Sequence, residues 1–462
     1  MLSVVEREQI NLPTGDFRTS ESIEITAGNA GSANELSQAL AAYGQATTVV
    51  SQPSPSCAHL IITEGLTEGE PAEFHARVLE QAKRLARLDH SSVSAITLLQ
   101  HTDAPSRAWL SGLPGLGRTL AKELRGTFVQ TLNLEGAALA TTPQLDAACR
   151  AILGRPGHGD MTIAPDGTAR GPRLVTQKSL TPSPLPITPD DTFIATGGGQ
   201  GITADCTRAL AEKSGAHVFL LGRTKPIAWP QWLDPDLSEK DVRGVLAHNQ
   251  LKTSNKPDLS SIAQMSRALV ASRTIARTLE AIRASGAGAD YLCADITDEK
   301  AVASAVGHII ALRGSVTGLI HGAGRLADRD LGKMTAADVE TVFGPKVDGL
   351  RLLLDRLDPS NLKHVALFSS AAAQFGNPGQ ANYAMANEVL NHLAHDLKAR
   401  FPDISVTSFN WGPWEGGMVS PALKAAFRAR GIKTLDTKMG ANLFADVMMS
   451  DLNATEVCIG EI

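Results

Sequence analysis

Cysteines, long apolar runs and clustered basic residues are all scarce in this 462-residue chain. No stretch approaches the roughly 18 apolar residues of a membrane span, and the first thirty residues carry charges where a signal peptide would be apolar. The net charge of −5, with scattered Lys and Arg, leaves no basic stripe for nucleic acid. We therefore expect a cytoplasmic protein that binds neither membrane nor nucleic acid. The cysteines are odd in number, far apart and never in a CxxC spacing, which argues against disulfides and a metal site: Cys57, Cys149, Cys206, Cys293 and Cys458.

Length and composition suit two large domains rather than one, because 43% of the residues are hydrophobic and 20% are charged. Proline concentrates in 181–189, TPSPLPITP, which we interpret as a linker or a domain-edge strand. On each side of it, short apolar runs alternate with longer helical patterns. This alternation predicts an α/β fold with a parallel sheet and helices on its faces. We place the first domain at 1–185 and the second at 186–462.

The predicted strands of both domains are short apolar runs. A segment at about 225–271 is too long for an ordinary connection and predicts an insertion that is partly helical. Helical segments are expected at Glu70–Leu88 and Leu116–Leu124. The predicted strands are Ser22–Thr26, Ala46–Val50, His59–Glu64, Val93–Leu99, Phe128–Asn133, Thr192–Thr196, His217–Leu221, Tyr291–Ala294, Gly318–His321, His364–Phe368 and Ser405–Asn410.

A glycine-rich turn opens the second domain. Strand Thr192–Thr196 runs into GGGQGIT and then into a helical pattern, so the glycines lie where a first strand turns into a first helix. Residues without side chains at this place let the backbone approach a pyrophosphate, which then faces the helix N-terminal amides. A tight turn without a ligand is the alternative. The predicted cofactor contacts here are Thr196, Gly197, Gly198, Gly199, Gln200, Gly201 and Ile202.

The ends of three further strands predict the rest of the nucleotide site. Arg223 stands where an NAD-preferring enzyme would place an acid, and its guanidinium suits a 2′-phosphate, which favours NADPH. A solvated surface arginine is the alternative. Asp295, with Ile296 beside it, follows the third strand and could accept from the adenine amine or cap a helix. After the fourth strand, small residues leave room for the ribose and nicotinamide: His321, Gly322, Ala323 and Gly324.

Four polar residues predict the chemistry. Tyr383 and Asn387 lie four apart in a helical pattern, so both project from one face. Ser370 ends the preceding strand, and Lys346 lies 24 positions before it. A phenol can give a proton to a carbonyl oxygen when a nearby cation brings its pKa closer to working pH. The family resemblance described next would make Tyr383 the donor, Lys346 the cation and Ser370 a hydrogen-bond donor to the same oxygen.

These motifs resemble the short-chain dehydrogenases, with Thr203 in place of the third glycine of the turn. Lys346, Ser370, Tyr383 and Asn387 are similar in order and spacing to the ketoreductase domains of modular polyketide synthases, where lysine and asparagine exchange places. LADRDL, KVDGL, LFSSAA, GQANYAMANEVLN and NWGPWEGGMV look most like the ketoreductases of polyunsaturated fatty acid synthases and related iterative synthases. The clear similarity covers about 192–460. The first 180 residues are similar more weakly, through GLPGLGRTLAKEL and MTIAPDGTARGPRL.

The resemblance implies two Rossmann-like units: a degenerate structural subdomain followed by a catalytic, doubly wound one. It implies NADPH-dependent reduction of a β-ketoacyl group on the phosphopantetheine of an acyl carrier protein, with other synthase domains as partners. Lys346 and Tyr383 would also contact the nicotinamide ribose, and Asn387 would hold Lys346 or a water. Residues around Trp414 are expected to form a lid over the nicotinamide and the acyl chain, or simply to pack in the core. The two sequence markers that the family associates with the stereochemistry of the alcohol are both incomplete in this chain. The substrate contacts are expected at Phe375, Gly376, Trp414 and Met418.

Two other functions compete with an active reductase. A catalytically silent module that docks carrier protein would be expected to lack the tyrosine or the lysine, and both are present. A dehydratase or epimerase of the extended short-chain family would keep lysine four after the tyrosine, where this chain has Asn387.

Overall fold

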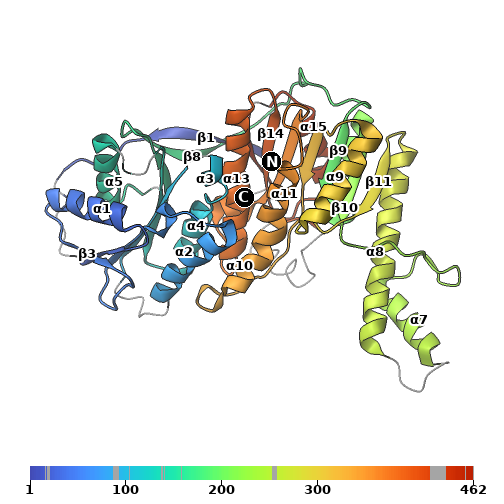
Figure 1. The fold of residues 1–462 in the computed structure, drawn as a ribbon, viewed down its shortest axis with the longest axis horizontal. Coiled ribbons are helices and arrows are strands. Elements are labelled where there is room, and N and C mark those ends of the chain that lie inside the picture. Colours follow the sequence, from blue (N-terminus) through green and yellow to red (C-terminus); the bar gives the residue numbers. More distant parts are fainter. Residues whose placement is uncertain are drawn as a thin grey trace.

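The computed structural model describes residues 1–15, 17, 21–86, 93–102, 105–136, 139, 141–157, 159–251, 258–416, 433–452 and 454–460. Figure 1 shows two α/β halves side by side, with both chain termini between them. The elements of the first half are β1 Leu2–Ile10, β2 Ile23–Thr26, α1 Ala30–Ala42, β3 Thr47–Val50, β4 His59–Ile62, η1 Glu64–Leu66, α2 Pro71–Ala86, β5 Ala95–His101, α3 Pro105–Ala108, α4 Leu113–Glu123, β6 Phe128–Leu134, α5 Thr142–Gly154, β7 Asp160–Ile163 and β8 Ala169–Thr176.

The second half begins with the strand that precedes the glycine-rich turn. It contains the π-helical turn η3 as well as ordinary helices. Its elements are β9 Thr192–Thr196, α6 Gly201–Ser214, β10 His217–Gly222, α7 Glu239–Leu251, α8 Leu259–Ala284, β11 Ala289–Cys293, α9 Glu299–Arg313, β12 Gly318–His321, η2 Leu331–Lys333, α10 Ala336–Phe343, η3 Gly344–Asp348, α11 Gly349–Leu354, β13 His364–Ser370, α12 Ala371–Phe375, α13 Ala381–Arg400, β14 Ser405–Trp411, α15 Thr437–Met448 and β15 Glu456–Ile459.

One sheet runs through both halves. Among the described residues it has fifteen strands, in the order β11-β10-β9-β12-β13-β14-β15-β1-β8-β7-β6-β5-β4-β2-β3. Within each half the neighbouring strands are mostly parallel, which confirms the predicted α/β fold class. All eleven predicted strands are present with ends within two residues of the expected ones.

Strand β1 joins the two halves, although it belongs to the first by sequence. It pairs antiparallel with β15, with Leu2 opposite Ile459, and antiparallel with β8, with Ile10 opposite Ala169. The sheet is therefore continuous across the proposed boundary near residue 185. Sequence reasoning missed β1, β7, β8 and β15 because they are short or partly charged, and their partners lie far away along the chain.

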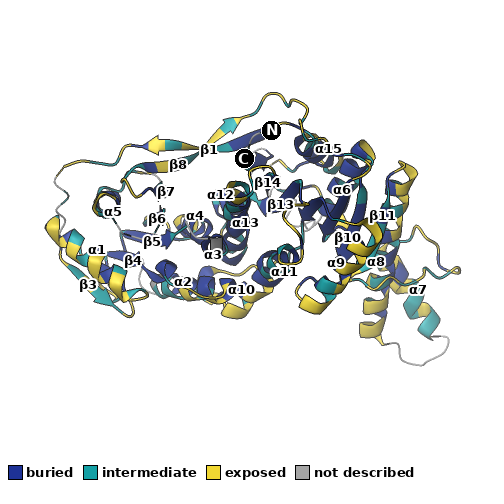
Figure 2. Ribbon diagram, turned by 45° about the horizontal axis from the view of Figure 1, so that its top comes forward, coloured by how far each residue is buried: buried dark blue, intermediate teal, exposed yellow. Residues whose placement is uncertain are grey.

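The hydrophobic core also crosses between the halves. One cluster joins Leu113 and Leu116 of α4 with Met385 and Leu390 of α13, and all four are fully buried. Figure 2 shows the central strands of each half as buried, whereas β3 and parts of β1 and β8 are intermediate or exposed. Because burying apolar area stabilises by about 25 cal/mol per Å², this contact helps to hold the two halves together.

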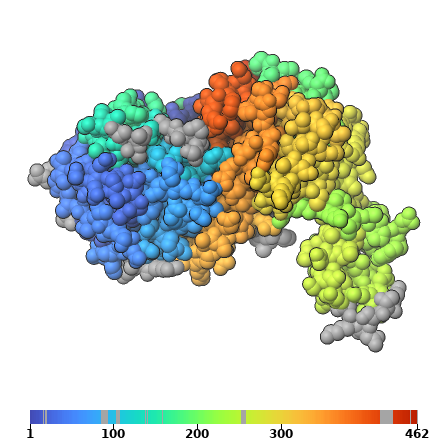
Figure 3. Space-filling model, viewed as in Figure 1, coloured from blue at the N-terminus to red at the C-terminus, as the bar shows by residue number. Residues whose placement is uncertain are grey.

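Among the described residues the predicted insertion is partly helical. It contains α7 and the first part of α8, a 26-residue helix that continues to Ala284. The α7–α8 pair extends away from the body of the molecule, as Figure 3 shows at the lower right. A small cluster of its own holds it together, with Leu233, Val242 and Leu269 at its centre. No helix in the described ranges is long and apolar enough to span a bilayer.

Candidate active site

The glycine-rich turn lies where the strand order of the second half reverses. Strands β9 and β12 are neighbours, but the chain leaves them toward opposite sides, and such switch points are the usual ligand sites of parallel sheets. A Cβ atom at Gly197 would lie 3.0 Å from the carbonyl oxygen of Gly322. A Cβ atom at Gly322 would lie 2.1 Å from the Thr203 hydroxyl. Thr203 therefore fills space left by Gly322, which compensates for the third glycine that the turn lacks.

The start of α6 fits a phosphate. Gly201 has φ +69°, and a Cβ atom there would find nothing within 4 Å. Gln200 precedes the helix in an extended conformation and no side chain caps it, nor does the first turn carry an acid. The amides of this 14-residue helix are thus free to face an anion.

The matching place in the first half is already filled. Asn29 caps α1 with its own side chain, which accepts a hydrogen bond from the Ser32 amide at 3.1 Å. A Cβ atom at Gly28 would lie 2.6 Å from Cγ of Glu64. The carboxyl of Glu64 in turn bonds the Thr26 hydroxyl. These contacts support the prediction that the first half is a degenerate nucleotide fold.

Arg223 and Asp295 lie together at the ends of β10 and β11. Arg223 is 54% exposed, and its Nη1 is 4.0 Å from Oδ2 of Asp295. The other oxygen of Asp295 accepts from the amide and the hydroxyl of Thr297 at 3.0 and 2.7 Å. Burial acts to raise the pKa of Asp295, but those hydrogen bonds and the Arg223 and Arg325 charges hold it below its ordinary value. Ile296 is buried against Gly349.

His321 links the ends of β9 and β12 to the segment that carries Lys346. Its Nε2 is 2.9 Å from the carbonyl oxygen of Lys346, and its Nδ1 is 2.9 Å from the Thr196 hydroxyl. A carbonyl can only accept, so Nε2 donates and Nδ1 accepts from Thr196. Burial, with the Lys346 charge, lowers the pKa of His321 to about 3, so the ring stays neutral. Its role is to hold the site together.

Lys346 is a buried amine beside Tyr383. It lies on the π-helical turn η3, a rare geometry that is frequent at functional sites. Its Nζ donates to the carbonyl oxygen of Phe368 at 2.8 Å and lies 5.7 Å from the centre of the Tyr383 ring. Burial lowers the pKa of Lys346 to about 7. Gly324 makes room for it, since a Cβ atom there would lie 3.2 Å from Cε of Lys346.

Ser370, Tyr383 and Asn387 meet at the same place. Ser370 ends β13, and its hydroxyl accepts from the Ala372 amide at 3.1 Å. Burial raises the pKa of the Tyr383 phenol, while hydrogen bonds with the Ser370 and Asn387 side chains act to lower it. The Asn387 amide donates to the Tyr383 carbonyl at 2.8 Å, and its buried Oδ1 has no partner within the described structure. The structure thus brings together all four residues predicted for the chemistry.

The residues predicted to contact substrate are more scattered. Phe375 is half-buried at the end of α12. Gly376 has φ +68°, and a Cβ atom there would lie 2.4 Å from the carbonyl group of Arg118, so it faces α4. Trp414 is only 2% exposed and packs 4.8 Å from Trp411, centre to centre. Met418 lies outside the described residues, so a lid and its contacts stay predictions.

Sequence reasoning missed Asn382 and Arg118. Asn382 donates to the carbonyl oxygens of Ala327 and Asp338 at 3.0 Å each, and its Oδ1 accepts from the Tyr383 amide at 2.8 Å. Arg118 is a buried cation from the other half. The sequence hint for Arg118 was a single arginine inside the helical segment GLPGLGRTLAKEL. An arginine at such a place is equally typical of a helix face in contact with solvent.

Comparisons with known proteins show what this chain is similar to. The KR domain family model matches residues 191–416. One subunit of the polyunsaturated fatty acid synthase of Thraustochytrium sp. is 32% identical over 389 residues, or 81% of this chain. 5-Methyl-1-naphthoate synthase of Streptomyces sahachiroi is 27% identical over 437 residues, or 88% of this chain. The chain spans only 14% and 22% of the lengths of these relatives.

Solved structures show the same fold. The ketoreductase PlmKR1, from the first module of phoslactomycin biosynthesis in Streptomyces sp. HK803, aligns with a TM-score of 0.74 at 20% identity, over 100% of this chain and 93% of that one. A ketoreductase domain from the bacillaene assembly line aligns with a TM-score of 0.69 at 21% identity, over 100% of this chain and 97% of that one. Both alignments extend over both halves of the sheet.

Proposed function

Because this chain belongs to the ketoreductase domains of polyketide and polyunsaturated fatty acid synthases, we propose that it uses NADPH to reduce the β-keto group of an acyl thioester to a hydroxyl. The observation that carries the proposal is the meeting of a buried lysine, a phenol and a serine hydroxyl beside a phosphate-type turn. A strand-end serine, a core tyrosine and a buried lysine are each explicable alone. Their convergence at one switch point is what a reductase requires.

NADPH would supply the hydride, one hydrogen with its electron pair, that reduces the β-carbon. The chain's residues would bind and orient it: the glycine turn and the α6 amides would hold the pyrophosphate, and Arg223 the 2′-phosphate. Ser370 would donate a hydrogen bond to the carbonyl oxygen, where negative charge grows. Tyr383 would give that oxygen its proton, and the Lys346 ammonium would stabilise the phenolate left behind. Asn387 would use its unpartnered Oδ1 to accept from Lys346 or from a water that returns the proton.

The proposed substrate and partners are supported by the relatives. The two compared synthases are far longer than this chain, so we propose that it acts among other synthase domains. A growing acyl chain in such an assembly would be presented as a thioester on the phosphopantetheine of an acyl carrier protein. The segment after α12, which begins at Gly376, would then form a wall of the entrance for that arm.

The test is direct reduction. The purified chain is mixed with NADPH and a β-ketoacyl N-acetylcysteamine thioester, and nicotinamide absorbance is followed. We expect turnover in the wild type and a loss of about 10²- to 10⁴-fold in kcat for Tyr383→Phe, with NADPH binding retained. No oxidation of NADPH by the wild type would refute the proposal and favour a silent docking module.

A further inference from the structure

Helix α4 of the first half makes two hydrogen bonds to the segment that connects the proposed catalytic serine and tyrosine. Lys122 donates to the carbonyl oxygen of Gly376 at 3.0 Å. The carboxylate of the next residue, Glu123, accepts from the Gly379 amide at 2.8 Å. Both contacts bind main-chain atoms of the connecting segment, so they fix its path rather than a particular side chain.

Helix α4 also touches α13 backbone to backbone. A Cβ atom at Gly112 would lie 2.8 Å from the carbonyl oxygen of Met385, and one at Gly115 would lie 2.5 Å from that of Ala384. These two carbonyls directly follow Tyr383 in the first turns of α13. The glycines of the segment GLPGLG thus let the two helices approach more closely than side chains would allow.

Arg118 is the polar centre of this contact. Its guanidinium donates to Ala373 O at 2.7 Å on α12, to Glu388 Oε2 at 3.0 Å on α13, and to Asp160 Oδ2 at 2.6 Å on β7. The side chain is 12% exposed, and each of the two acids is 3% exposed. Burial alone would lower the pKa of Arg118, but the Glu388 and Asp160 carboxylates hold it above its ordinary value. One planar cation thus joins three elements.

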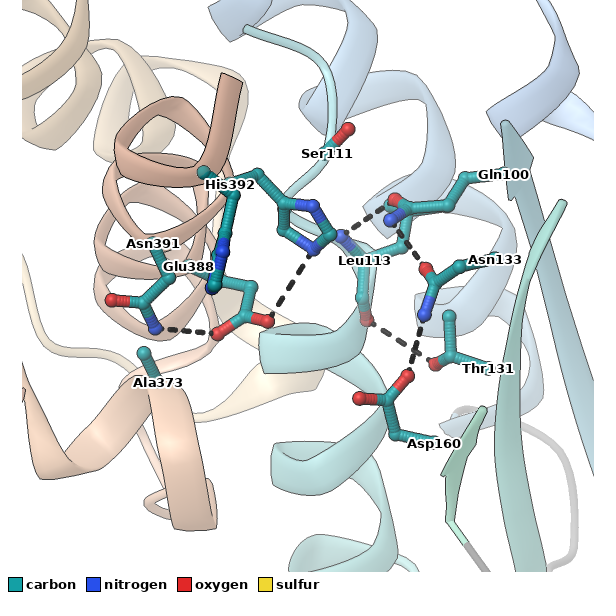
Figure 4. Close-up of polar contacts among 12 residues, drawn as sticks. Gln100, Ser111, Leu113, Thr131, Asn133, Asp160, Ala373, Glu388, Asn391 and His392 are labelled. Atoms are coloured by element: carbon teal, nitrogen blue, oxygen red, sulfur yellow. Dashed lines mark hydrogen bonds and ion pairs between the residues drawn. The ribbon is translucent and has the colours of Figure 1, made fainter. Parts of the chain in front are cut away.

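From Glu388 a buried chain of hydrogen bonds continues to the neighbours of the proposed catalytic residues. Asn391 donates to Glu388 at 3.0 Å and to Asn410 at 3.1 Å. Ser369, next to Ser370, donates to Asn410 and to the Asn387 carbonyl oxygen, each at 3.0 Å. Figure 4 shows Glu388 and Asn391 on α13 facing Asp160 and its partners on the first half.

We propose that Arg118 is a positioning residue for the reduction, through which the first half sets the relative placement of Ser370 and Tyr383. This inference rests on the proposed function. The guanidinium fixes α12 three residues after Ser370 and α13 five residues after Tyr383, and it anchors both to β7 of the first half. A displacement of about 1 Å between reacting groups can cost roughly 100-fold in rate.

Arg118→Lys tests this role because it keeps the charge that both buried acids need, but a single ammonium cannot reach all three acceptors. We expect kcat to fall about 10- to 100-fold, with the KM and Kd for NADPH unchanged. Hydrogen–deuterium exchange should accelerate over 371–391. The matched control is Arg155→Lys, in an ion pair with Glu21 of the same half that touches neither α12 nor α13, and it should change none of these quantities.

The outcomes separate the two proposals. A folded Arg118→Lys protein with kcat within twofold of the wild type overturns the positioning role, as does an equal loss in Arg155→Lys. If the wild type reduces nothing, the proposed function fails, and unchanged exchange over 371–391 in Arg118→Lys overturns the positioning role separately. If Arg118→Lys does not fold, Glu388→Gln decides, because it keeps an acceptor oxygen but removes the charge that Arg118 pairs with on α13. We expect a three- to tenfold lower kcat, about 1 kcal/mol of lost contact, and no loss overturns the role.

Discussion

Lys346→Met should abolish reduction and at the same time stabilise the fold. Burial lowers the pKa of this lysine from 10.5 to about 7, so below pH 7 the folded chain carries the cost of a buried charge. That difference corresponds to about 5 kcal/mol. Methionine has a similar length without the charge, although it leaves the Phe368 carbonyl without its donor, at a cost of about 1–3 kcal/mol. We expect a net gain of about 2–4 kcal/mol at pH 6.5.

The sign of the pH dependence distinguishes this explanation from a better-packed core. Between pH 7 and 10.5 the unfolded chain keeps the lysine proton that the folded chain has lost, so the wild type gains stability as pH rises. The advantage of Lys346→Met should therefore be about 3 kcal/mol smaller at pH 9 than at pH 6.5. Urea unfolding at both pH values measures it, with the 76% exposed Lys333→Met as the control that should change nothing. An advantage independent of pH would refute the reasoning.

Three further predictions concern activity and packing. The kcat/KM of the wild type should fall as pH rises through about 7, because Lys346 loses its charge. In Lys346→Arg the fall should move to higher pH, because the guanidinium keeps its charge. A pH-rate profile of each protein measures this. Gly115→Ala should lower the free energy of unfolding by about 1–3 kcal/mol, because the added Cβ atom meets a backbone carbonyl. Gly31→Ala is the control and should not lower it, since the nearest neighbour of its Cβ atom would be 3.6 Å away. The midpoints of urea unfolding measure both effects. Arg223→Ala should raise the KM for NADPH about 10-fold or more and leave that for NADH nearly unchanged, and an unchanged preference would contradict its role.

The local parts of this molecule were predictable from sequence, and the long-range parts were not. Strands such as Thr192–Thr196 are buried on both faces and have an apolar centre between two threonines, so their pattern alone identifies them. The spacing of Tyr383 and Asn387 places them on one helix face wherever that helix lies. By contrast, Leu2 pairs with Ile459 almost a full chain length away, and no local pattern encodes that partner. The burial of Arg118 was likewise not predictable from local sequence, because its partners on α12, α13 and β7 lie far away along the chain.

The contacts of α13 bear on the expected exchange of positions between the lysine, here Lys346, and the asparagine, here Asn387. The face of α13 that follows Tyr383 is pressed against α4 at Ala384 and Met385, and the next turn carries Glu388 into a buried network with the first half. At the position of Asn387, α13 carries an uncharged side chain one residue before Glu388, which pairs with Arg118. Lys346 comes from η3, and its Nζ donates to the carbonyl oxygen of Phe368. The proposed catalytic cation therefore comes from η3, a different element from the helix that packs against the first half, so the contacts of α13 with Arg118 and the placement of Lys346 do not compete for the same position.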